Sequence, residues 1–124
     1  MKWMGIVGLL AGLTALGGCA GNACKCDIMA AESKCVQQAA PDNPLYATQL
    51  QATCDTTLSS LCETLGGTYT FGQACPTGDL AAECHTEYAS YSQTVFYYTT
   101  GGDPFTSQDP DFDEDCDGGV VTRY

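Results

Sequence analysis

The sequence contains 124 residues, with 15 acidic side chains, four Lys or Arg and a formal net charge of −11. This charge argues against nucleic acid as a partner, because nucleic-acid binding depends on Lys and Arg neutralising phosphates. The length suits one small domain, and nine cysteines in so short a chain are typical of an exported, disulfide-bonded protein.

The first element of the chain is an apolar run. Lys2 precedes 13 uncharged residues, Met4 to Leu16, whereas a membrane-spanning helix needs about 20 apolar residues. A positive residue, a short apolar core and then the small residues Gly17 and Gly18 are typical of a secretory signal peptide. We therefore expect residues 1–18 to be a cleaved signal peptide.

A cysteine follows directly, and Leu16-Gly17-Gly18-Cys19 resembles the lipobox of bacterial lipoproteins. The resemblance implies that Cys19 receives a diacylglyceryl thioether, that the chain is cut before Cys19, and that the new amino terminus is acylated. Three acyl chains would hold the protein firmly on a membrane. Ala20 lacks the Asp that favours inner-membrane retention in this family, which implies an outer-membrane address in the bacterial envelope. The alternatives are an ordinary signal peptide and an uncleaved anchor.

Lipidation of Cys19 leaves an even number of cysteines. Eight cysteines in an exported domain predict four disulfides, with 105 possible pairings. The eight candidates are Cys24, Cys26, Cys35, Cys54, Cys62, Cys75, Cys84 and Cys116.

Two helices are expected after a short tether, residues 19–25. Residues 27–40 are rich in good helix formers, and residues 45–65 repeat apolar or cysteine positions at steps of three and four. Pro41 and Pro44 interrupt the two stretches, and Gly66-Gly67 ends the second. We therefore predict a helical hairpin over residues 26–67.

The cysteine spacing suggests how this hairpin is bonded. Cys26 and Cys35 lie nine residues apart, and Cys54 and Cys62 lie eight apart, so the axial rises are nearly equal at about 1.5 Å per residue. In an antiparallel hairpin, Cys35 would face Cys54 and Cys26 would face Cys62. We predict these two bridges.

The remainder, residues 68–124, is predicted to be a small antiparallel β-sheet in the same domain. Residues 68–71, 94–100 and 120–124 are β-branched and aromatic. A weak internal repeat, in which a cysteine precedes Gly-Gly and a strand, occurs after Cys62 and after Cys116, and suggests two strands side by side. The fold class is therefore α+β, small and disulfide-rich. Residues 62–124 resemble uncharacterised small cysteine-rich bacterial envelope lipoproteins, which implies a fold and an address but no activity.

The acidic tail is the sharpest chemical candidate. Asp113, Asp115, Asp117 and Gly118 fit the D-x-D-x-D-G start of a calcium loop. Tyr124 stands where an EF-hand needs a bidentate Glu, which excludes an EF-hand. A looser calcium loop remains open, and the simpler interpretation is a solvated acidic turn.

Other motifs have mainly structural interpretations. Cys24-Lys25-Cys26 suits thiol exchange or a soft metal, but in an oxidising compartment each cysteine is expected to pair elsewhere. His85 is the only histidine, and no nucleophile motif accompanies it. A cluster of aromatic residues could form a sugar- or peptide-binding platform, although we expect these residues to be mostly core. The cluster consists of Tyr88, Tyr91, Phe96, Tyr97 and Tyr98.

These patterns favour a lipid-anchored, non-enzymatic envelope protein with a structural or protein-interaction role. Its partners would be the membrane, through the lipid, and an envelope protein. The alternative is a ligand-binding module, for calcium through the tail or for glycan through the tyrosines. No cofactor other than calcium is suggested.

Overall fold

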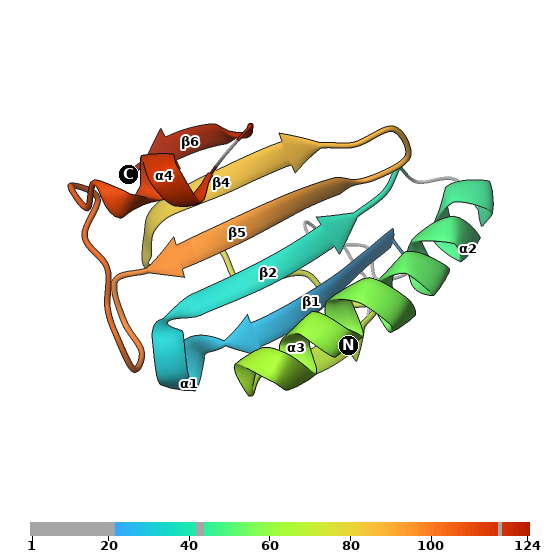
Figure 1. The fold of residues 1–124 in the computed structure, drawn as a ribbon, viewed down its shortest axis with the longest axis horizontal. Helices are drawn as coiled ribbons and strands as arrows, with labels where there is room; N and C mark the ends of the chain where they lie inside the picture. Colours follow the sequence, from blue (N-terminus) through green and yellow to red (C-terminus); the bar gives the residue numbers. More distant parts are fainter. Residues whose placement is uncertain (1–21, 42–43, 117) are drawn as a thin grey trace.

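The computed structural model describes residues 22–41, 44–116 and 118–124, which form a six-stranded antiparallel sheet with helices on one face (Figure 1). The strand order is β3-β1-β2-β5-β4-β6. The strands are β1 Ala23–Ile28, β2 Lys34–Ala39, β3 Thr68–Phe71, β4 Leu80–Glu87, β5 Ser92–Tyr98 and β6 Val120–Arg123. The helices are α1 Met29–Glu32, α2 Pro44–Thr53, the π-helical η2 Cys54–Leu58, α3 Ser59–Leu65 and α4 Asp111–Asp115.

The predicted helical hairpin over residues 26–67 is wrong, because its first half is a β-hairpin. Strands β1 and β2 pair antiparallel and are joined by the single turn α1. The left-handed Ser33, at φ 55°, ends α1, and its fully buried hydroxyl accepts a hydrogen bond from the Asp103 amide. Helix propensity is a weak preference that tertiary pairing overrides, and β2 gains a second partner in β5.

The second helical prediction is confirmed as one continuous helix over α2, η2 and α3. Its buried positions Leu50, Cys54, Leu58 and Cys62 recur every fourth residue. In an α-helix, four residues exceed one full turn by about 40°, so this stripe would drift around the helix. The wider turn of η2 counteracts the drift. Gly66 ends the helix in the left-handed conformation that its position favours, with φ 73°.

All eight predicted cysteines form disulfides, and these staple both faces of the sheet. The bonds are Cys24–Cys54, Cys26–Cys62, Cys35–Cys75 and Cys84–Cys116. The Cys26–Cys62 bridge was predicted, and Cys24 and Cys26 each pair elsewhere, as expected. The Cys35–Cys54 prediction is wrong. Equal spacing along an axis does not decide the pairing in a strand, because neighbouring positions point to opposite faces, and Cys35 is the strand partner of Asp27 and not of Cys26.

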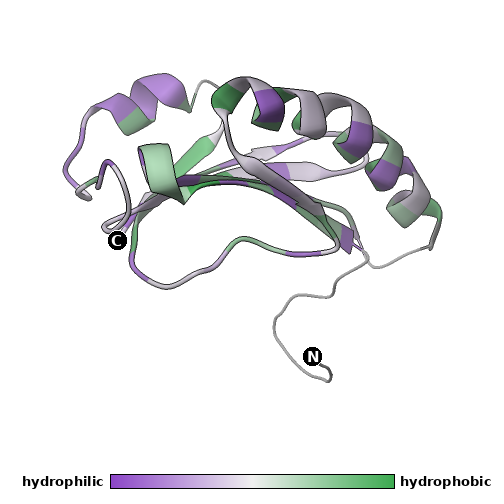
Figure 2. Ribbon diagram, turned by 90° about the horizontal axis from the view of Figure 1, so that it is seen from below, coloured by the Kyte–Doolittle hydropathy of each residue, from purple (hydrophilic) through white to green (hydrophobic). Residues whose placement is uncertain are grey.

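Side-chain alternation explains this pairing. Cys24 and Cys26 lie on the helix-covered face, and Cys35 points to the other face by register. Residues 72–79 cross that other face between β3 and β4, and they carry Cys75 to Cys35 (Figure 2). The bridge packs with the buried Phe96 and Tyr98.

The sheet consists of two similar halves related by an approximate twofold axis. In each half a hairpin is followed by a helical segment, a disulfide to the first strand and an edge strand. The order is β1, β2, the helix ending in α3, and β3 in one half, and β4, β5, α4 and β6 in the other. In the strand register, Cys26 lies opposite Val36 and Cys84 lies opposite Val95. Val36 and Val95 lie opposite each other where the halves meet. The register of β2 on β5 is therefore consistent with this symmetry.

The internal repeat noted in the sequence belongs to this symmetry. The strands that follow its two Gly-Gly corners lie at opposite edges of the sheet, so the expectation that they lie side by side is wrong. A Cβ on Gly67 would lie 2.9 Å from Cys62 Sγ, and one on Gly119 would lie 2.9 Å from Cys116 Sγ. At Gly119, Thr86 Oγ1 would lie closer still, at 2.6 Å. A disulfide sulfur and neighbouring strand atoms therefore leave no room for a Cβ at either corner.

Candidate functional site

A cleft lies at the end of the sheet where β2 stops and the β4–β5 turn begins. Its volume is about 330 Å³, and its walls are residues 39–41, Tyr46 of α2, and the turn residues 87–92. The β4–β5 turn is closed by a hydrogen bond from the Tyr88 amide to the Tyr91 carbonyl, at 2.9 Å. Helix α2 and the β4–β5 turn therefore position three tyrosines around one cleft.

Two of these tyrosines form a stacked pair. The rings of Tyr88 and Tyr91 lie 4.9 Å apart between centroids and are inclined by 20°. Tyr91 also packs on the core cluster that contains Leu50, whereas Tyr88 is 48% exposed. One ring is thus fixed by the core and the other presents an aromatic surface to solvent, which suits contact with flat apolar surfaces.

The proposed aromatic platform is divided by the structure. Phe96, Tyr97 and Tyr98 are 1–6% exposed and belong to the core. Tyr98 donates a hydrogen bond to the Pro76 carbonyl, and burial raises its pKa. Only Tyr88 and Tyr91 of the five reach the cleft, where Tyr46 joins them. Sequence reasoning missed Tyr46 because it lies on another element, far from the cluster in the chain.

A second aromatic group lies under α4. Phe112 is 1% exposed, and its ring centroid lies 4.6 Å from that of Tyr97 and 5.6 Å from that of Phe105. Burial, and secondarily the Asp115 carboxylate, raise the pKa of Tyr97 to about 12. This group packs α4 against the sheet.

His85 joins two polar neighbours on adjacent strands. Its Nδ1 lies 2.8 Å from Thr94 Oγ1, and its Nε2 lies 2.6 Å from Glu87 Oε2. The strand register causes this row, since His85 and Thr94 are direct partners of β4 and β5. Thr94 is buried and is not part of the cleft wall, whereas Glu87 is. The row therefore orients a carboxylate at the rim of the cleft.

The acidic tail is organised by a cation from the protein itself. Arg123 Nη2 lies 2.9 Å from Asp113 Oδ2, and Arg123 Nη1 donates to the carbonyls of Ser107 and Asp109. Asp113 and Asp115 both lie in α4, where two residues rotate the side-chain direction by about 200°.

Part of the calcium hypothesis lies beyond what the structure describes. Within residues 22–41, 44–116 and 118–124, no group of three metal-ligating side chains is found. Asp117 lies outside these residues, so the calcium loop stays a prediction. Cys19 and the lipobox also lie outside them.

Comparison with protein-family models, curated proteins and solved structures gives no significant match to the chain. In the part that the structure describes, none of the helices is long and apolar enough to cross a membrane. The resemblance to bacterial lipoproteins therefore depends on the lipobox residues themselves.

Proposed function

We propose that the chain is exported and anchored by a lipid on Cys19 to a bacterial membrane, with an outer-membrane address where one exists. Its disulfide-bonded domain would have a non-enzymatic, structural or protein-interaction role there. The lipobox resemblance suggests the anchor, and the disulfides of the folded domain support it.

The cysteine pairing carries this proposal. The eight other cysteines are all bonded to one another, so Cys19 has no cysteine partner left within the chain. A thiol reserved in this way is what lipid attachment requires. An unmodified thiol beside four disulfides would instead favour exchange and mispairing.

The disulfides also support the proposed compartment. In three of the four bridges both cysteines are 5% exposed or less. In the fourth bridge Cys84 is 6% exposed and Cys116 is 5% exposed. The bridges are therefore integral to the core, and bridges of this kind form in oxidising compartments outside the cytosol. The fold starts at β1, only a few residues after Cys19, so the domain would lie close to the membrane.

The alternative function is a ligand-binding module, and the stacked tyrosines at the cleft are the observation that favours it. A sugar ring would place its apolar face on Tyr88. This alternative and the anchoring proposal are compatible, since an anchored domain can also bind a ligand.

The test compares the native chain with Cys19→Ser in a bacterial host that processes lipoproteins. We expect the native chain in the membrane fraction, with an amino-terminal peptide whose mass includes the acyl chains, and Cys19→Ser in the soluble fraction. The control is Cys84→Ala with Cys116→Ala, which removes a disulfide and should stay with the membrane. If Cys19→Ser remains membrane-bound, the anchor is elsewhere and the proposal is wrong.

A further inference from the structure

The end of the sheet that carries the cleft is also the end where the chain enters the domain. We infer that this end rests against the phospholipid surface, with Leu45 and Tyr88 in the head-group layer. The inference rests on the proposed lipid anchor at Cys19 and specifies how the anchored domain is oriented.

The connection between anchor and cleft is short. The Ala40 amide donates a hydrogen bond of 2.9 Å to the Asn22 carbonyl, and Ala40 is part of the cleft wall. Asn22 follows Cys19 by three positions, and a chain of that length spans at most about 11 Å. A lipid on Cys19 therefore holds the cleft close to the bilayer surface.

The side chains at this end suit a membrane interface. Leu45 is 65% exposed and Tyr88 is 48% exposed, so both belong to the five large hydrophobic side chains that are exposed in the described part of the chain. Leu45 lies beside Tyr46 at the start of α2, and Tyr46 and Tyr88 share the cleft wall. Tyrosine is enriched at membrane–water interfaces because its ring is apolar and its hydroxyl is polar.

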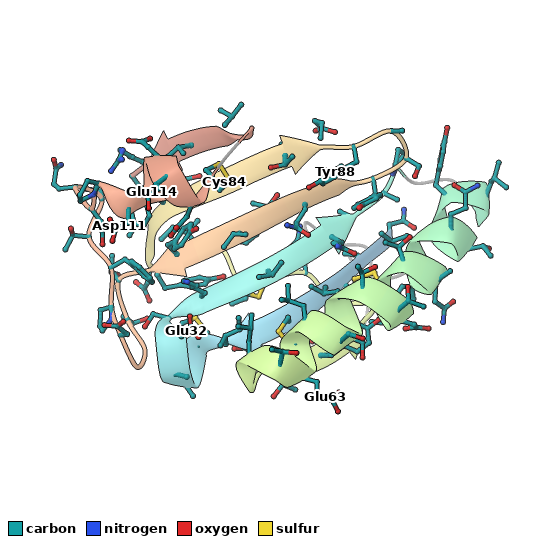
Figure 3. All side chains as sticks on the ribbon, viewed as in Figure 1. Glu32, Glu63, Cys84, Tyr88, Asp111 and Glu114 are labelled. Atoms are coloured by element: carbon teal, nitrogen blue, oxygen red, sulfur yellow. A yellow bond between two sulfur atoms is a disulfide. The ribbon has the colours of Figure 1, made fainter. Side chains whose placement is uncertain are left out.

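Acidic side chains gather at the end of the sheet opposite the cleft, away from the proposed membrane surface. Figure 3 places Tyr88 at one end of the sheet and Asp111, Glu114 and Glu32 toward the other. The strands between the two ends are six to eight residues long, or roughly 20 to 25 Å. This is more than twice the screening length of about 8 Å at physiological salt, so the acidic end avoids repulsion by anionic head groups.

Among the residues that the structure describes, one carboxylate lines the cleft. Glu87 lines the cleft and is bonded to His85 Nε2. This hydrogen bond holds its Oε2 at the His85 ring, 2.6 Å from Nε2. We therefore expect contact to depend on the apolar residues and to be little changed by the salt concentration.

A tryptophan probe tests the orientation. Trp3 is the only tryptophan of the chain and lies in the predicted signal peptide, so a processed protein has no tryptophan emission. The probes are Tyr88→Trp and Leu45→Trp at the cleft end. The control is Leu61→Trp, 42% exposed on α3, about 24 Å along the helix from Leu45.

Each variant is purified with its native lipid and reconstituted in phosphatidylcholine vesicles containing brominated lipid. A side chain held in the interface layer lies about 5–10 Å into the boundary between head groups and acyl chains, so we expect bromolipid to reduce its emission. We expect this loss for Tyr88→Trp and Leu45→Trp, and little loss for Leu61→Trp. Equal quenching of all three probes, or quenching of Leu61→Trp alone, would overturn the inference.

Three further outcomes separate this inference from its alternatives. If the lipid-bearing protein does not sediment with vesicles, the anchor fails and the inference fails with it. If the protein sediments but its cleft-end probes are not quenched, the orientation alone is wrong. If a soluble oligosaccharide shifts the Tyr88→Trp emission in the Cys19→Ser background, and vesicles do not quench Tyr88→Trp in the lipid-bearing protein, the tyrosines serve a glycan and the orientation is wrong.

Discussion

Replacing Cys84 and Cys116 together by alanine is expected to lower the free energy of unfolding by about 4 kcal/mol. The bridge joins residues 32 positions apart, and the chain-entropy relation for a loop of that length gives about 3.7 kcal/mol at 25 °C. No other disulfide connects α4 or β6 to the rest of the described fold. The whole loop is therefore released in the unfolded chain.

The symmetry-related bridge, Cys26–Cys62, provides the matched comparison. Its sequence separation of 36 is slightly larger, yet Cys24–Cys54 already joins the same strand to the same helix. The additional loop that Cys26–Cys62 closes is then only about ten residues, for which the relation gives about 2.7 kcal/mol. Cysteines of both bridges are buried, so the packing cost of the alanines largely cancels in the comparison.

The measurement is urea denaturation of both double variants under non-reducing conditions, followed by far-UV circular dichroism. We expect the Cys84/Cys116 variant to be less stable than the Cys26/Cys62 variant by about 1 kcal/mol. If the Cys26/Cys62 variant is instead the less stable of the two, loop length does not determine the contribution of these bonds. Strain or residual structure in the unfolded chain then controls it.

Three further changes test the packing. Gly67→Ala places a Cβ 2.8 Å from Cys26 Sγ, and a thermal melt should show a loss of stability of about 1–3 kcal/mol. The control is Gly78→Ala, whose Cβ would have nothing within 4 Å and should change stability by less than about 0.5 kcal/mol. Equal effects of the two substitutions would contradict the close contact at Gly67. Phe112→Ala should cost about 3–5 kcal/mol in urea denaturation, and a loss below about 1 kcal/mol would show that α4 packs loosely. Because the pKa of Tyr97 is raised from 10.0 to about 12, its stabilising contribution is complete below pH 10 and is lost as the pH rises to 12. Tyr97→Phe should reduce this alkaline loss, and an unchanged pH profile would contradict the assignment.

Elements whose local signals agree with their tertiary environment were predictable. The helix over residues 44–65 combines good helix formers with a glycine stop, and the edge strand β3 occupies residues 68–71 as predicted. Strand β5 begins two residues before its predicted start, and β6 ends one residue before its predicted end. These segments are β-branched and aromatic, so propensity and final structure point in the same direction.

Strands β1, β2 and β4 were missed because their own residues favour other structures. The segment of β4, LAAECHTE, contains Ala and Glu, which are depleted in strands. It becomes a strand because β5 and β6 pair with it on both sides. Its Ala81 and Ala82 are 1% and 0% exposed, so small side chains are what the packing there allows.

The cleft and the disulfides were likewise predictable only in part from the sequence. The sequence alone indicated tyrosines near residue 88, the even count of disulfide cysteines and the separate role of Cys19. Only the tertiary structure decided which tyrosines are core, brought Tyr46 to the turn, and paired Cys35 with Cys75. Composition and local pattern are properties of neighbouring residues along the chain, whereas pairing and burial depend on strand register and side-chain direction between residues far apart in it.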